Sequence, residues 1–63
     1  MNYVTARAVS LTKYLIKQGL SPSDAISISI SKYIKNPKLD IKKMIKKIKK
    51  EIKAEFYFEE EDL

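Results

Sequence analysis

Seven lysines in the last third of the chain have a type and spacing suited to binding anions. On a helix that turns about 100° per residue, four of them follow one edge of an apolar stripe and three cover the back. They are Lys42, Lys43, Lys46, Lys47, Lys49, Lys50 and Lys53. Ammonium groups arranged in this way can contact phosphates through charge alone. Base reading typically uses Arg, Asn or Gln, and residues 38–57 contain none, so we expect contacts that ignore base sequence.

The same lysines also have an explanation without a ligand. Residues 38–53 carry eight lysines against two carboxylates, a net charge of +6, whereas residues 54–63 carry five carboxylates and no cation. Surface enrichment in Lys and Glu is typical of hyperthermophile proteins, where it need not indicate binding. A solvated lysine face is therefore one alternative, and contact with an acidic protein surface is another.

Residues that perform catalysis or bind metals are scarce in this chain. It has no His and no Cys, and its single glycine leaves no glycine-rich phosphate loop. We therefore expect no enzyme activity, no catalytic residues, no metal and no cofactor. The sequence has no apolar run near the roughly 18 residues of a membrane span and no signal-peptide pattern at its start. These features favour a cytoplasmic protein without membrane contact.

The elements expected to position the lysines are all helical. The apolar spacing predicts an all-α fold, a compact three-helix bundle with helices at about 3–18, 22–35 and 38–57. Gly19 ends the first helix, Ser21 and Pro22 begin the second, and Pro37 precedes the third. We expect one domain at 1–58 and a flexible acidic tail at 59–63. The predicted buried faces are Val4, Ala8, Leu11 and Leu15 with Val9 and Ile16 beside them, then Ile26, Ile30, Tyr33 and Ile34, then Ile41, Met44, Ile45, Ile48, Ile52 and Phe56.

Two segments also fit a strand. Residues 3–9 include β-forming side chains, and residues 25–31 alternate between Ile or Ala and Ser with a period of two. The capping signal at Ser21 favours a helix for the second segment.

Protein contacts are expected at apolar residues that the predicted helices leave outside the core. A helix at 22–35 places Ile28 off its main apolar face, and three adjacent aromatic residues, 56–58, cannot all face one core. Ile28, Tyr57 and Phe58 are therefore the expected protein-contact residues. A chain of 63 residues has a marginal core, so a homo-oligomer is a further expectation.

The segment from Gly19 to Ile26 resembles the turn between the two helices of ribbon–helix–helix DNA-binding proteins. That turn often reads Gly, apolar, Ser, any residue, Ser, acid, Ala, Ile, as it does here. The resemblance implies a dimeric transcriptional regulator in which residues 3–9 pair as a strand across the dimer. It further implies that Thr5 and Arg7 face the bases and that the backbone at 21–23 holds a phosphate.

A second resemblance concerns the whole chain. Its length, its Lys and Ile bias and its three expected helices beside a basic face are similar to small helical accessory subunits of crenarchaeal B-family DNA polymerase holoenzymes. This implies an archaeal, non-enzymatic accessory subunit in DNA replication, bound to a larger assembly such as a DNA polymerase. Three hypotheses result: such a subunit with non-specific contacts to DNA phosphates, a ribbon–helix–helix regulator, and a protein–protein adaptor without a nucleic-acid role.

Overall fold

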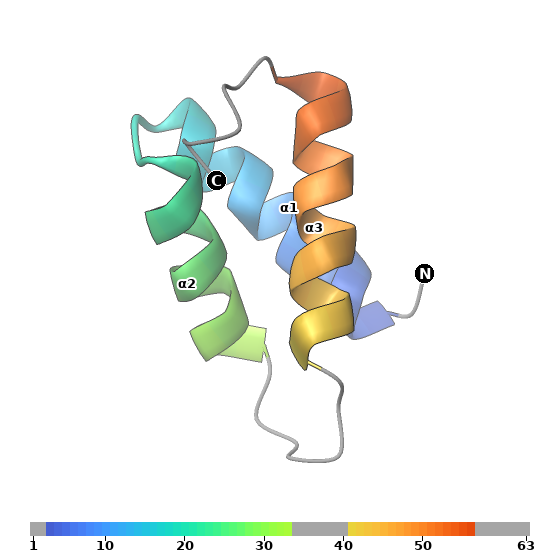
Figure 1. The fold of residues 1–63 in the computed structure, drawn as a ribbon. Coiled ribbons are helices and arrows are strands. Elements are labelled where there is room, and N and C mark those ends of the chain that lie inside the picture. Colours follow the sequence, from blue (N-terminus) through green and yellow to red (C-terminus); the bar gives the residue numbers. More distant parts are fainter. Residues whose placement is uncertain (1–2, 34–40, 57–63) are drawn as a thin grey trace.

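The computed structural model describes residues 3–33 and 41–56, which form three helices (Figure 1). Helix α1 spans Tyr3–Lys17, α2 spans Pro22–Tyr33 and α3 spans Ile41–Glu55. The described part of the chain contains no strand. The predicted all-α three-helix bundle is therefore confirmed, and the strand alternatives for residues 3–9 and 25–31 are wrong.

The predicted helix boundaries differ from the observed ones by small amounts. Gln18, which the apolar pattern includes in the first helix, belongs to the turn that follows α1. Some predicted positions lie outside the described residues, namely Ile34 in the second buried face, helix positions 35, 38–40 and 57, and the tail 59–63.

The turn between α1 and α2 has the local chemistry that the sequence indicates. Gly19 adopts a φ of 103°, a conformation that residues with a Cβ rarely adopt. The Leu20 N–H donates to the Leu15 carbonyl at 3.1 Å and the Gly19 N–H donates to the Ile16 carbonyl at 3.0 Å, which is a Schellman motif. At the start of α2, the Asp24 N–H donates to Ser21 Oγ at 3.2 Å, which caps the helix.

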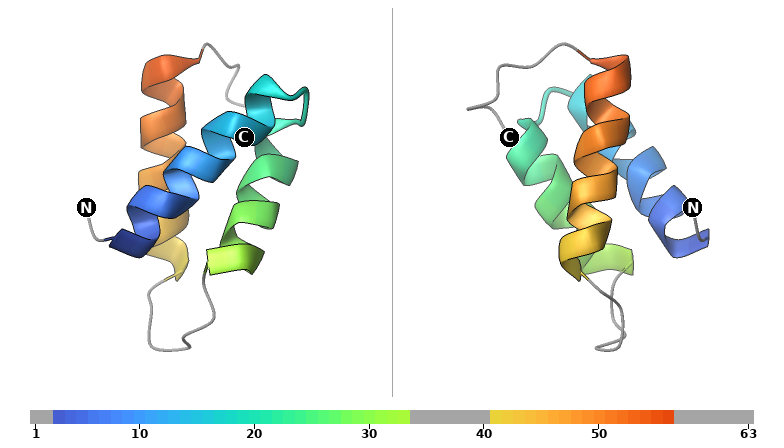
Figure 2. Two further views of the ribbon diagram at one scale, coloured as in Figure 1. Left: turned by 180° about the vertical axis from the view of Figure 1, so that it is seen from behind. Right: turned by 45° about the vertical axis from the view of Figure 1, so that its right-hand side comes forward.

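Helix α1 is the element that holds the bundle together. Figure 2 shows it running diagonally across both α2 and α3, and it packs against each of them more extensively than they pack against each other. The buried apolar side chains come from all three helices and are Ala8, Val9, Ala25, Ile26, Met44, Ile48 and Ile52. Because the core is small, each of these side chains accounts for a large part of the hydrophobic stabilisation.

The buried face of α1 differs from the predicted one. Its buried residues are Thr5, Ala8, Val9 and Thr12, whereas Val4, Leu11 and Leu15 are only half-buried. On this face Thr12 Oγ1 lies 2.7 Å from Ser29 Oγ of α2, and the contact is buried between the two helices. Small residues at this contact allow α1 and α2 to approach closely, which turns the bulkier leucines toward the edge.

The buried face of α3 agrees largely with the prediction. Met44, Ile48 and Ile52 are buried, and Ile45 and Phe56 pack against the core at its edge. Ile41 is an exception, since it is the first residue of the helix and 42% exposed. The core therefore begins one turn later than the sequence indicates.

Candidate anion-binding surface on helix α3

The seven lysines of α3 form one surface, called here the lysine surface. Six are exposed and Lys49 is half-buried, so the helix separates them from the buried Met44, Ile48 and Ile52 on its other side. This arrangement follows from the sequence, because apolar residues recur at spacings of three and four and the lysines occupy the remaining positions. The structure thus places all seven predicted nucleic-acid-binding residues on one helix, outside the core.

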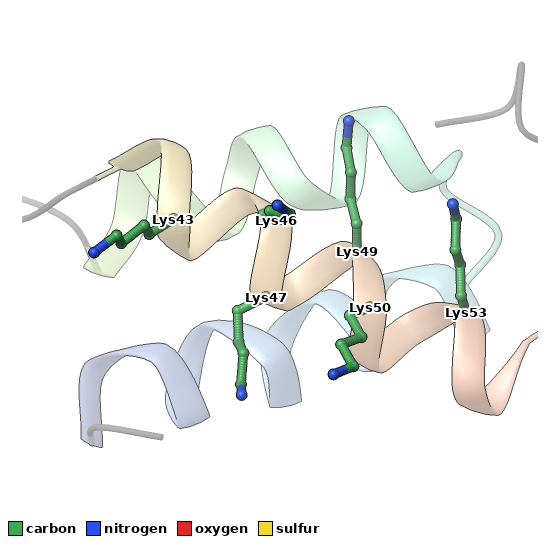
Figure 3. Close-up of a pocket in the computed structure, with 6 residues that line it drawn as sticks. All are labelled: Lys43, Lys46, Lys47, Lys49, Lys50 and Lys53. Carbon is green, nitrogen blue, oxygen red and sulfur yellow. The ribbon is translucent and has the colours of Figure 1, made fainter.

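The side chains of the lysine surface spread apart. In Figure 3, Lys49 and Lys53 extend toward the side of α3 on which α2 lies, and Lys47 and Lys50 extend toward the side of α1. The space of about 640 Å³ between the lysine stems is open to solvent. Ammonium groups that point in several directions do not enclose one small ligand. They suit an extended polyanion, which can contact several of these ammonium groups along its length.

The charge pattern of α3 opposes the stability of its own helix. Each pair of like charges four residues apart destabilises a helix by about 0.2–0.5 kcal/mol. Such lysine pairs in α3 are Lys42–Lys46, Lys43–Lys47, Lys46–Lys50 and Lys49–Lys53. The first turn of α3 has no acidic residue, so Lys42 also faces the positive end of the helix dipole. A surface needed only for solubility would be more stable with alternating Glu and Lys, and a bound anion would relieve this repulsion.

Acidic residues of α3 lie beside the opposite edge of the apolar stripe. Glu55 Oε1 is 3.9 Å from Lys13 Nζ of α1, and both side chains are partly exposed, so the pair contributes little stability. This ion pair marks the boundary between α1 and α3. It also directs the Glu55 carboxylate toward α1 instead of toward the lysine surface.

Of the three predicted protein-contact residues, Ile28 lies within the described part of the chain, on α2 and not on the lysine helix. Ile28 is 45% exposed on α2, about 200° around that helix from the buried Ile26, so its predicted exposure is confirmed. Tyr57 and Phe58 lie outside the described residues.

The residues implied by the ribbon–helix–helix resemblance are also located. Thr5 is buried within α1 and Arg7 is exposed on it, so the strand that this resemblance needs at 3–9 is not formed. At the start of α2, the hydroxyl of Ser21 accepts the Asp24 N–H as a helix cap.

Two features of the described residues did not emerge from the sequence patterns. Tyr3 and Tyr14 of α1 are 70% and 57% exposed, and Arg7 lies on the same side of the helix. A groove of about 390 Å³ runs between α2 and α3 and is lined by Ile26, Ser27, Ile30, Ser31 and Ile45. The spacing of Tyr3, Arg7 and Tyr14 (i, i+4 and i+11) was the available signal for the first feature. No sequence signal could have shown the groove, because it depends on the helix crossing.

Neither a metal site nor a membrane span is found within residues 3–33 and 41–56. These residues contain no group of three or more acidic, His or Cys side chains that could hold a metal ion. None of the three described helices is long and apolar enough to cross a bilayer.

Comparisons with known proteins give no match, whether with protein-family models, with curated proteins or with solved structures.

Proposed function

We propose that this protein is a non-enzymatic binding module whose lysine surface contacts the phosphates of duplex DNA without reading base sequence. In this proposal it acts as an accessory subunit beside a larger DNA-processing assembly. The observation that carries the proposal is the repulsive spacing of the lysines on α3, which a polyanion would stabilise.

The length of α3 sets the scale of the expected contact. Lys42, Lys46, Lys49 and Lys53 follow one edge over 11 residues, a rise of about 16 Å. Three to four phosphate contacts along this edge predict a slope of log K against log salt of about −3 to −4. The duplex affinity should then fall about a hundredfold between 50 and 200 mM salt.

A duplex titration with charge-matched variants tests the proposal. Lys46→Gln combined with Lys53→Gln removes two exposed charges from this edge of the lysine surface, and Lys17→Gln combined with Lys32→Gln removes two exposed charges from α1 and α2. The first variant should flatten the salt slope by about two units, whereas the second should leave the slope unchanged. The affinity should be the same for duplexes of unrelated sequence.

The other hypotheses correspond to different outcomes. Equal effects of the two variants would mean that only net charge matters and would overturn the lysine surface as a site. Tight binding to one sequence would favour the regulator, and absence of binding at low salt would favour the adaptor.

The exposure of Ile28 favours a protein contact as a second component of this function. Tyr57 and Phe58 are proposed to contribute to it as well. An Ile28→Ser variant should weaken co-purification with a partner assembly while leaving the duplex affinity unchanged.

A further inference from the structure

The outward side of α1 carries an exposed set of aromatic and cationic side chains, Tyr3, Arg7 and Tyr14, called here the tyrosine surface. Tyr3 is 70% exposed and Tyr14 is 57% exposed, although tyrosine rings are usually more buried in a folded domain. On a helix the three residues fall within about 40° of one another, and the two rings stand about 16 Å apart along the axis.

Arg7 is held in place by its neighbour on the same helix. Its Nε donates a hydrogen bond of 2.8 Å to the hydroxyl of Tyr3, and its guanidinium carbon lies 5.1 Å from the centre of the Tyr3 ring. These contacts lay the guanidinium against one ring and restrict its freedom before any ligand binds. The result is a flat, positively charged group held against Tyr3, with Tyr14 about two turns further along the same side of α1.

The charge around the tyrosine surface indicates the class of ligand. Helix α1 carries Arg7, Lys13 and Lys17 and no acidic residue. Within residues 3–33 and 41–56, Glu55 forms an ion pair with α1, its Oε1 lying 3.9 Å from Lys13 Nζ. An anionic ligand with flat apolar faces complements such a surface. Single-stranded nucleic acid is that ligand, because its bases are free to stack and its phosphates carry the charge.

We propose that the tyrosine surface stacks unpaired bases, so that the protein binds single-stranded nucleic acid more tightly than duplex. The inference rests on the proposed function in one respect, since the lysine surface supplies phosphate contacts to either form. The tyrosine surface adds a preference for single strands over duplex, which the lysines alone do not provide. In a duplex the bases are already stacked on one another and their faces are closed to Tyr3 and Tyr14.

Substitutions at Tyr14 separate stacking from other roles. Tyr14→Leu removes the aromatic face and keeps apolar bulk, whereas Tyr14→Phe keeps the ring and serves as the matched control. Because Tyr14 is exposed and lies outside the core, neither change should unfold the domain, which far-ultraviolet circular dichroism would verify. The probes are a fluorescently labelled thymidine homopolymer and a duplex of equal length, titrated with the full chain at one salt concentration.

The wild-type protein should bind the homopolymer more tightly than the duplex. Tyr14→Leu should weaken homopolymer binding about 5- to 160-fold, the usual effect of losing one stacked base, and leave duplex affinity unchanged. Tyr14→Phe should retain affinity but show less quenching of tyrosine fluorescence when the homopolymer binds.

Three outcomes would overturn the inference. In the first, the homopolymer affinity of Tyr14→Leu equals that of the wild type. In the second, homopolymer and duplex affinities fall equally. In the third, Tyr14→Leu changes only the sedimentation of the free protein, which would identify the tyrosine surface as a protein-docking face. Salt-dependent duplex binding by the wild-type protein would leave the lysine surface standing in each case, whereas a wild-type protein that binds neither the homopolymer nor the duplex would refute both proposals.

Discussion

A pair of buried hydroxyl groups connects α1 to α2 and contributes to the stability of this small domain. Thr12 Oγ1 lies 2.7 Å from Ser29 Oγ and 2.7 Å from the Ala8 carbonyl oxygen. Ser29 Oγ lies 2.9 Å from the Ala25 carbonyl oxygen. Each hydroxyl has one proton, so two of these three contacts can be hydrogen bonds at any time. Both side chains are fully buried, and removing one therefore alters the bonding of the other.

Two single substitutions and their combination measure this coupling. Thr12→Val keeps the side-chain shape and leaves Ser29 donating to Ala25, so the free energy of unfolding should fall by about 1 kcal/mol. Ser29→Ala leaves Thr12 donating to Ala8 and should lower it by a similar amount, about 1 kcal/mol. The double variant removes both hydroxyls and the desolvation that their burial requires. Its free energy of unfolding should lie within about 1 kcal/mol of the wild-type value, instead of about 2 kcal/mol below it.

Urea unfolding of the full chain, followed by far-ultraviolet circular dichroism, gives the three differences. Ser27→Ala on the exposed side of α2 is the control, and it should change the free energy of unfolding by less than about 0.5 kcal/mol. A loss of about 2 kcal/mol in the double variant would show that the hydroxyl groups act independently and would refute the reasoning. If Thr12→Val and Ser29→Ala are each as stable as the control variant, the pair of hydroxyl groups contributes nothing to the free energy of unfolding.

Two further predictions concern stability, each measured by thermal or urea unfolding. Ile48 is fully buried, so Ile48→Ala should lower the free energy of unfolding by about 2–5 kcal/mol. Ile41 is largely exposed, so Ile41→Ala should lower it by less than about 1 kcal/mol. Equal losses in the two variants would contradict the observed core. Gly19 has a φ of 103°, and a Cβ added there would meet no atom within 4 Å. Gly19→Ala should therefore cost about 1 kcal/mol through backbone strain alone, and an unchanged stability would contradict that strain.

The helices and the lysine surface were predictable because their signals are local. Ser21 and Asp24 specify a helix start, and that signal prevails over the alternation of Ile and Ser in residues 25–31. Within that alternation, Ser29 is buried and Ile28 is exposed. On a helix with 3.6 residues per turn, an alternation of Ile and Ser therefore places both residue types on the buried side and on the exposed side.

The tyrosine surface was not predictable in the same way, because it depends on which side of α1 faces its neighbours. Apolar residues occupy more than half of the circumference of α1, so several orientations bury a similar apolar area. An orientation centred on Leu11 agrees with the sequence as well as the observed one. The orientation of α1 therefore depends on which side chains of α2 face it.

For α3, the sequence by itself determined which face is buried and where the lysines lie. Its apolar positions form one narrow stripe, and burying that stripe leaves only one place for the lysines. For α1, only the tertiary structure decided. The Thr12 hydroxyl can donate to the Ala8 carbonyl of its own helix in any orientation of α1. Its buried contact with Ser29, 17 residues away, forms only when α1 turns its small residues toward α2. That rotation places Val9 in the core and leaves Tyr3 and Tyr14 on the outside of the bundle.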